Sequence, residues 1–317
     1  MHSPNRLIAL IREQTSRPAP RGLEALCAEI LTRHGGAIAA ILFYGSCFRK
    51  GDAFDGLVDL YVLVDGYRAA YQRILHAVLN KLLPPNVYYL EVPYNGHTLR
   101  AKYTVISLTD FQKGTSLKWF HSYIWGRFAQ PTGILHVRND QVAESLHAAL
   151  AQSVVTFLTR ALPLAPEQFD ARNIWHLGLL HSYRSELRAE RPDKLARLFD
   201  AAPQHYEQMT EAAVGFLPYR IDPLTDADPQ RYCAPISARK RFANRWAWRL
   251  RFVQGKILSA LRLLKALFTF KGGIDYVLWK IERHSGVTVE IAPRLRRIPL
   301  IGIAVIFWRL YRRGAFR

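Results

Sequence analysis

The sequence predicts an α+β protein in which a small sheet with helices is followed by a helical domain and then by a basic amphipathic helical region. Three observations support this class. Residues 1–138 alternate apolar runs of strand length with helical stretches. Residues 139–235 are dominated by helical periodicity, and residues 236–317 combine many Lys and Arg with apolar side chains. We therefore expect three domains, at 1–138, 139–235 and 236–317.

The individual elements follow from periodicity and from turn residues. Gly35 and Gly36 end a first helix, Pro84 stops a second, and Asn95-Gly96 is typical of a hairpin turn. An arginine-bearing helix is expected within residues 1–20. Further helices are predicted over residues 22–34, 67–83, 142–162, 173–188, 193–200 and 206–217, and strands over residues 37–44, 57–64, 87–92 and 101–107.

The most informative stretch joins the first two strands. The first strand ends at Gly45-Ser46, a polar loop follows, and the next strand carries Asp59 among apolar residues. Glycine lets the backbone approach a phosphate closely, and the serine hydroxyl can donate a hydrogen bond to it. A carboxylate within a buried strand is costly unless it is paired or binds a metal. Asp59 is therefore a candidate magnesium ligand, and the alternative is an aspartate paired with a buried arginine.

This stretch resembles the signature of the nucleotidyltransferase superfamily, in which a strand ends in Gly-Ser and the next strand carries Asp-x-Asp. Leu57 stands here at the position of the first aspartate. One branch of the superfamily, the mitochondrial-type CDP-diacylglycerol synthases, has an apolar residue at that place, and Val58-Asp59-Leu60 resembles its motif. The resemblance implies a nucleotidyltransferase-like mixed sheet.

The likeness to these phosphatidate cytidylyltransferases extends along the chain. Lys102 lies in a Lys-Tyr-Thr-Val-Ile stretch, Arg127 in Gly126-Arg127-Phe128-Ala129-Gln130-Pro131, and Glu186 and Arg188 in a stretch that begins at Ser182. Thr104 and Gln130 depart from the glycine and lysine usual in the family. The resemblance implies that Lys102 is catalytic and that Gly45, Ser46, Arg127, Glu186 and Arg188 bind nucleotide or phosphate. A surface salt bridge is the simpler interpretation of Arg127 and Arg188. For Lys102 the alternative is an outward-facing residue of an alternating strand, and for Glu186 it is a solvated helix face.

A metal ion is expected, because nucleotidyl transfer needs charge neutralisation as pyrophosphate leaves. One carboxylate rarely suffices for Mg²⁺, so a second is required. Glu91, on a later strand, is the predicted second ligand, although an edge-strand charge that faces water fits it equally well. Asp55 and Glu186 are the other candidates.

The charge is strongly asymmetric. The chain carries a formal net charge of +19, of which the segment from Arg239 to Arg317 contributes +16 and residues 1–238 only +3. Such asymmetry favours nucleic acid or an anionic membrane as a partner. The tail has Leu, Ile, Phe and Trp between its cations, as in residues 256–270, and the apolar run of residues 298–308 is too short to span a bilayer. It is therefore expected to bind an anionic membrane surface, and no nucleic acid is expected.

The predicted function is transfer of CMP from CTP to phosphatidic acid, with Mg²⁺ as cofactor, to give CDP-diacylglycerol and pyrophosphate. The expected location is peripheral, on the cytoplasmic face of a bacterial inner membrane, or on the matrix side of the mitochondrial inner membrane in a eukaryote. Three cysteines without metal-ligand spacing favour a reducing compartment. A nucleic-acid-associated nucleotidyltransferase and a catalytically inactive scaffold remain the alternatives.

Overall fold

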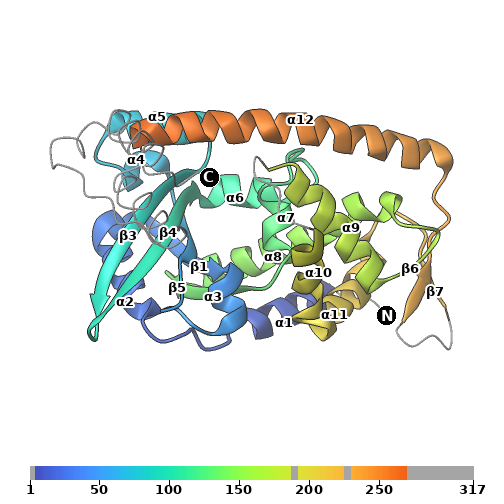
Figure 1. The fold of residues 1–317 in the computed structure, drawn as a ribbon, viewed down its shortest axis with the longest axis horizontal. Coiled ribbons are helices and arrows are strands. Elements are labelled where there is room, and N and C mark those ends of the chain that lie inside the picture. Colours follow the sequence, from blue (N-terminus) through green and yellow to red (C-terminus); the bar gives the residue numbers. More distant parts are fainter. Residues whose placement is uncertain (1–3, 187–191, 225–229, 270–317) are drawn as a thin grey trace, which may run out of the picture.

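The computed structural model describes residues 4–186, 192–224 and 230–269. It shows an α+β protein with two sheets, and one long helix runs along an edge of the molecule (Figure 1). The helices are α1 (Pro4–Thr15), α2 (Leu23–His34), α3 (Gly45–Lys50), α4 (Tyr67–Ala70), α5 (Ile74–Leu82), α6 (Leu108–Thr115), α7 (Trp125–Phe128), α8 (Asp140–Ala161), α9 (Ala171–Arg184), α10 (Pro192–Asp200), α11 (Pro203–Ala213) and α12 (Ala238–Thr269). The strands are β1 (Ile38–Tyr44), β2 (Val58–Val64), β3 (Asn86–Tyr94), β4 (His97–Ser107), β5 (Thr132–Val137), β6 (Gln168–Asp170), β7 (Asp222–Leu224) and β8 (Arg231–Cys233).

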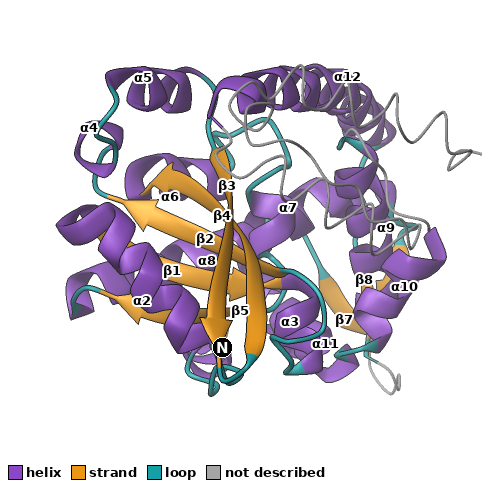
Figure 2. Ribbon diagram, turned by 60° about the vertical axis from the view of Figure 1, so that its left-hand side comes forward, coloured by secondary structure: helices purple, strands orange, loops and turns teal. Residues whose placement is uncertain are grey.

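The larger sheet has five strands in the order β3-β4-β2-β1-β5. Only the β2–β4 pair in this sheet is parallel, and the other pairs are antiparallel, so the sheet is mixed as predicted. The three-stranded sheet β6-β8-β7 lies at the other end of the molecule (Figure 2).

The central strands read as continuous apolar runs because both faces of the sheet are covered. On β2, Leu60 and Val62 point into a core with α2, whereas Tyr61 and Leu63 point into a second core that includes α1 and α8. Side chains alternate between faces with period two, so Asp59 lies at the end of the row that contains Tyr61 and Leu63.

Two sequence predictions are corrected by local structure. Residues 45–50 form helix α3 rather than a loop. Gly51, which has a left-handed φ of 68°, ends this helix. The single helix predicted over residues 67–83 is two helices, because Tyr71 is extended and residues 71–73 interrupt the helix between α4 and α5.

Several elements were not predicted. Strand β5 completes the main sheet beside β1, and α6 and α7 follow the hairpin. The region interpreted as helical throughout contains β6, which pairs with β8 across about sixty intervening residues. Three-residue strands are too short to show a period in the sequence.

Helix α12 begins at Ala238 and packs against the rest of the protein, so it is not a detached tail. Trp248 is buried and its ring centroid lies 5.8 Å from that of Trp125 on α7. At Gly255 an added Cβ would come within 2.2 Å of the carbonyl oxygen of Ser185, so the helix passes very close to the end of α9. The tail prediction for residues 298–308 lies outside the described residues.

Candidate active site

The turn between β1 and α3 brings backbone close to Asp59. Gly45 has a φ of 78°, and a Cβ at this position would lie 3.4 Å from Oδ2 of Asp59. Both the left-handed backbone and the close approach favour glycine here. Because β1 and β2 pair with Tyr44 opposite Asp59, the Gly45-Ser46 turn begins next to the carboxylate.

Asp59 and Lys102 form the centre of the site. Parallel pairing of β2 with β4 sets Asp59 opposite Lys102, and Nζ of Lys102 lies 3.0 Å from Oδ1 of Asp59. The negative charge of Asp59 raises the pKa of Lys102 above its usual value, so Lys102 is a fixed positive charge at neutral pH.

A second ion pair lies alongside. Arg127 of α7 donates from Nη2 to Oε1 of Glu186 at 2.8 Å and from Nη1 to the Tyr61 hydroxyl at 3.3 Å. Its guanidinium carbon lies 4.5 Å from the ring centroid of Tyr123. Burial alone would lower the pKa of Arg127, but Glu186 and the surrounding tyrosines outweigh it and raise that pKa.

These groups share one cavity of about 330 Å³. It is lined by both ion pairs and by the Gly45-Ser46 turn, together with Tyr44, Arg49, Gln130, Pro131, Tyr183, Leu195 and Leu198. The structure thus brings together Gly45, Ser46, Asp59, Lys102, Arg127 and Glu186, which the sequence had selected from five separate segments.

Two predicted residues are not placed in the cavity. Glu91 does not line it, because its Oε1 accepts from the Tyr89 hydroxyl at 2.6 Å and from Arg100 at 3.1 Å on the hairpin. Arg188 lies outside the described residues.

The sequence analysis did not select seven of the lining residues, namely Tyr44, Arg49, Gln130, Pro131, Tyr183, Leu195 and Leu198. Arg49 lies three residues after Ser46, a spacing that places both on one side of helix α3. That signal depends on knowing that α3 is a helix, which the sequence analysis did not predict.

The carboxylates that line the cavity within the described residues are Asp59 and Glu186. Among those residues, no group of three or more His, Cys, Asp and Glu side chains is close enough to bind a metal. Mg²⁺ normally keeps several waters and binds through one or two carboxylates together with substrate phosphates. Asp59 with a bound triphosphate fits that pattern, whereas an all-protein metal cage does not.

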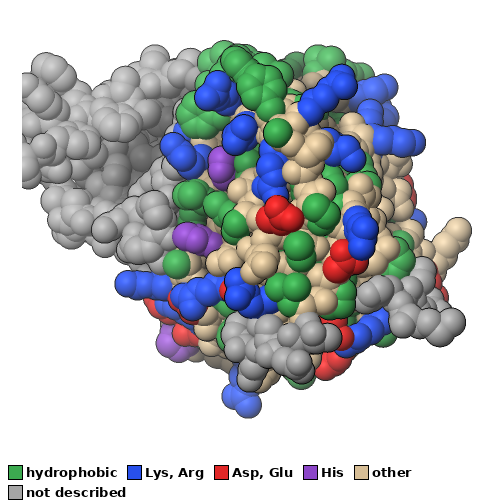
Figure 3. All heavy atoms as spheres, turned by 90° about the vertical axis from the view of Figure 1, so that its right-hand side faces the viewer, with side chains coloured by type: hydrophobic (Ala, Val, Ile, Leu, Met, Phe, Trp, Pro, Cys, Tyr) green, Lys and Arg blue, Asp and Glu red, His purple; other side chains and the backbone are tan. Residues whose placement is uncertain are grey.

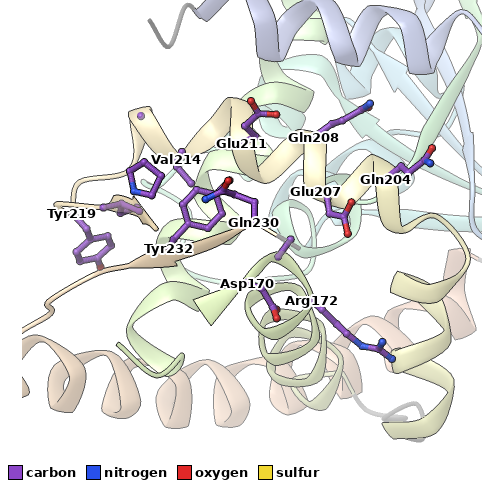
Figure 4. Close-up of a pocket in the computed structure, with 14 residues that line it drawn as sticks. Asp170, Arg172, Gln204, Glu207, Gln208, Glu211, Val214, Tyr219, Gln230 and Tyr232 are labelled. Carbon is purple, nitrogen blue, oxygen red and sulfur yellow. The ribbon is translucent and has the colours of Figure 1, made fainter. Parts of the chain in front are cut away.

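A larger cavity, of about 710 Å³, lies between α9, α11 and the β7–β8 strands (Figure 4). Asp170, Arg172, Glu207 and Glu211 contribute its charged side chains. It contains none of the motif residues, so its size alone does not make it the reaction site.

Comparison with known proteins decides the family. The model of a family described as "Phosphatidate cytidylyltransferase, mitochondrial" matches residues 66–230, which is more than half of the chain. The chain belongs to this family. Within the matched range lie Lys102, Arg127 and Glu186, whereas the Gly45-Ser46 turn and Asp59 precede it.

Because it belongs to the phosphatidate cytidylyltransferase family, the protein is a nucleotidyltransferase. A search of curated proteins found no match. Among solved structures, a nucleotidyltransferase-like protein from Exiguobacterium sibiricum 255-15 is similar at 12% sequence identity, with 92% of each chain covered and a TM-score of 0.26. No helix in the described ranges has both the length and the apolar character to cross a membrane.

Proposed function

We propose that this protein transfers CMP from CTP to phosphatidic acid and releases pyrophosphate. The observation that carries the proposal is the cavity in which the Gly45-Ser46 turn, the Asp59–Lys102 pair and the Arg127–Glu186 pair meet in a chain of this family. Arg49, Lys102 and Arg127 provide three positive charges against two carboxylates, which suits a polyphosphate substrate.

In the proposed reaction a phosphate oxygen of phosphatidic acid attacks the α-phosphorus of CTP. A bond forms between that oxygen and the α-phosphorus, the bond from the α-phosphorus to the bridging oxygen breaks, and pyrophosphate leaves with the electron pair. The attacking phosphate monoester is already anionic at neutral pH, so no general base is required. Catalysis then rests on positioning and on charge neutralisation.

Each residue has a role in this scheme. The Gly45 backbone and the Ser46 hydroxyl orient the triphosphate, and Lys102 and Arg127 neutralise charge on its oxygens. Tyr61 and Glu186 hold the Arg127 guanidinium in place. Asp59 would hold Mg²⁺, which would supply positive charge to offset the charge of the leaving group.

We also propose that the protein docks on an anionic membrane through α12 and α5. The outer face of α12 exposes apolar side chains at helical spacing, namely Phe242, Trp246, Leu250, Val253, Ile257, Leu261 and Leu264. Exposed cations, among them Arg245 and Arg249, lie beside them, and apolar and basic side chains interleave at the edge formed by α12 (Figure 3). This combination is typical of helices that lie in the membrane interface.

Helix α5 extends this surface. Ile74, Leu75, Val78 and Leu82 are 46–75% exposed on its nine residues. Arg262 donates from Nε to the carbonyl oxygen of Pro84 at 2.9 Å, so the end of α12 is attached to the loop that follows α5. Both helices lie along the same edge of the molecule (Figures 1 and 2). Exposed apolar residues between the cations favour lipid over nucleic acid as the partner.

The test is incubation with CTP labelled at the α-phosphorus, Mg²⁺ and vesicles that contain phosphatidic acid, followed by lipid extraction. We expect label in CDP-diacylglycerol and one pyrophosphate released for each lipid formed. Vesicles with diacylglycerol in place of phosphatidic acid, and reactions with ATP in place of CTP, are the controls. A folded protein that leaves the lipid fraction unlabelled would contradict the proposed reaction, and a gel shift on RNA or DNA at matched salt would favour the nucleic-acid alternative.

A further inference from the structure

The inner face of α12 carries a buried cation, Arg251, that pairs with no carboxylate in the described part of the chain; its guanidinium carbon lies 4.4 Å from the ring centroid of Phe120 and 5.1 Å from that of Trp248. Arg251 is 0% exposed, and its Nε donates to the carbonyl oxygen of Phe120 at 2.8 Å. Its Nη1 and Nη2 atoms are also buried, and neither has a hydrogen-bond partner within the described part of the chain. Desolvation by burial lowers the pKa of Arg251 to about 9, so the guanidinium remains charged at neutral pH.

A second arginine projects from the same face three turns later. The guanidinium carbon of Arg262 lies 4.4 Å from the ring centroid of Tyr123, and that of Arg127 lies 4.5 Å from the same centroid. One tyrosine ring therefore connects Arg262 to the wall of the active-site cavity. Nη1 of Arg262 is buried and lacks a partner among the residues described.

His121 lies in the segment that both α12 arginines contact, since Arg251 donates to the carbonyl oxygen of Phe120 and Arg262 lies over the ring of Tyr123. It is 3% exposed, and its Nε2 has no hydrogen-bond partner in the described ranges. Burial lowers its pKa to about 3, with further lowering by the positive charges of Arg262, Arg127 and Arg251. All three arginines thus act on one imidazole. The carboxylate that acts on Arg262 in the described residues is Glu186, and it is already paired with Arg127.

Buried polar groups without partners are rare in folded proteins, and a buried charge without a counter-charge is costly. Unpartnered donors on three side chains that meet at one short segment, residues 120–123, are better explained by a missing anion than by packing. We propose that Arg251, Arg262 and His121 form a subsite for a phosphomonoester dianion, and that its ligand is the phosphate of phosphatidic acid. This inference rests on the proposed function, for which it names the site of the lipid substrate.

The surroundings favour a lipid phosphate over a soluble one. Phe120 stacks on Arg251, with 4.4 Å from the guanidinium carbon to the ring centroid, and it is 38% exposed. Leu117, on the same segment, is 37% exposed. Movement of Phe120 would uncover one side of the Arg251 guanidinium, while Trp248 would remain beside it. A phosphate bound here would lie beside Tyr123 and Arg127, and its acyl chains would leave through apolar side chains.

Arg251→Met and Arg262→Met in the full-length protein test the subsite. The substrate is dihexanoyl phosphatidic acid below its micellar concentration, so membrane docking does not contribute. We expect the KM for this lipid to rise about tenfold or more, as for loss of a charge-assisted hydrogen bond, with the KM for CTP within about twofold of wild type. Arg220→Met, an exposed cation outside both α12 and α5, should leave both constants unchanged.

Thermal stability separates a binding role from a structural one. Replacing an unpaired buried charge by an apolar side chain of similar length should keep or raise the Tm. A lower Tm together with an equal rise in the KM for the lipid and the KM for CTP would overturn the subsite and make Arg251 structural. An unchanged KM for the lipid would overturn it as well.

A binding measurement keeps this inference distinct from the proposed reaction. Dihexanoyl phosphatidic acid should raise the Tm of wild type but not of Arg251→Met, whether or not CDP-diacylglycerol is formed. If the lipid binds in this way but no CDP-diacylglycerol is formed, the proposed reaction is contradicted and the proposed subsite stands. If inorganic phosphate raises the Tm of wild type as much as the lipid does, and Arg251→Met removes both increases, the assignment to phosphatidic acid is wrong.

Discussion

At the scale of single residues, Asp59 and Lys102 meet because two strands run parallel in register. The residues are 43 positions apart, yet β2–β4 pairing sets them opposite each other. The pair is partly exposed to the cavity, with 26% and 35% of the two side chains accessible. A substrate phosphate can therefore compete with Asp59 for Lys102, and a metal ion can compete with Lys102 for Asp59.

Asp59→Asn should nearly abolish turnover without unfolding the protein. The change removes the negative charge and keeps the volume, so we expect kcat to fall by about a hundredfold or more, with Tm within a few degrees of wild type. Turnover across a range of Mg²⁺ concentrations, together with thermal unfolding, checks this. Asp55→Asn is the matched control, because Asp55 pairs with Lys50 on the exposed loop and does not line the cavity. Normal turnover in the Asp59 variant would remove Asp59 from the mechanism.

His121 predicts a pH dependence of stability. Its folded pKa of about 3 lies below the ordinary value of 6.5, so the unfolded chain binds the proton more tightly. Its contribution to stability is therefore complete above about pH 6.5 and is lost as the pH falls toward 3. The loss is at most about 1.4 kcal/mol per pH unit for one proton.

The measurement is chemical unfolding of wild type and His121→Gln between pH 7 and 4. The free energy of unfolding should fall less steeply with decreasing pH for the variant than for wild type. The reason is that in wild type burial and the positive charges of Arg127, Arg251 and Arg262 oppose protonation of His121. His205, which is also buried with a pKa lowered to about 4, contributes equally to both proteins and cancels. Parallel curves would show that His121 is protonated as easily in the folded protein as in the unfolded one.

The residues found from sequence are those that belong to short motifs. Gly45, Ser46 and Asp59 lie within fifteen positions, and Lys102 and Arg127 carry the family resemblance. Arg262 approaches Tyr123 across 139 positions, and no local pattern reports such a contact. Glu91 was selected because it lies on a strand, but its side chain is held by a cross-strand partner, Arg100, on the exposed hairpin.

At the scale of elements, α12 differs from an ordinary surface helix because it buries two cations and exposes several large apolar side chains. A surface helix normally buries its apolar stripe and exposes its cations. Here Arg251 and Lys265 are buried, and Leu250, Val253 and Ile257 are exposed. The sequence showed the amphipathic period but not which face packs on the protein, because both faces contain large side chains.

This arrangement gives a test of the proposed membrane surface. Leu250→Gln, Val253→Gln and Ile257→Gln together keep a helix-compatible residue at each position and remove the apolar stripe. We expect binding to vesicles with anionic lipid to weaken about tenfold or more, because each apolar side chain contributes on the order of 1 kcal/mol or more when it leaves water. Turnover of dihexanoyl phosphatidic acid should stay near the wild-type value.

The cations of α12 supply the comparison. Arg245→Gln with Arg249→Gln should weaken vesicle binding at low salt and have little effect at high salt, since screening removes the same attraction from wild type. Co-sedimentation with vesicles at two salt concentrations measures both variants. If the triple apolar variant sediments like wild type, α12 does not insert into the membrane.

At the scale of the whole molecule, one core connects the predicted parts of the chain. The core that contains Trp125 and Phe157 also contains Trp248, so residues from all three predicted domains pack together. The sequence divided the chain by composition, whereas packing joins it through α8, α9 and α12. The three predicted domains stay predictions, but α12 is not a separable attachment in this packing.

Two truncations test how far α12 belongs to the catalytic body. A chain that ends at Thr269 keeps α12 and should retain cooperative unfolding and turnover of dihexanoyl phosphatidic acid.

A chain that ends at Ser237 loses Trp248, which is buried against Trp125, and the contact of Gly255 with the end of α9. Loss of a buried Trp alone costs about 3–5 kcal/mol, which is a large part of the roughly 5–15 kcal/mol that stabilises a typical domain. We therefore expect the shorter chain to unfold at least about 10 °C lower and to lose activity on soluble and vesicle substrates alike. Calorimetry and the two activity assays decide the matter: if the shorter chain keeps its Tm and loses only activity on vesicles, α12 serves membrane attachment alone and contributes nothing to the active-site fold.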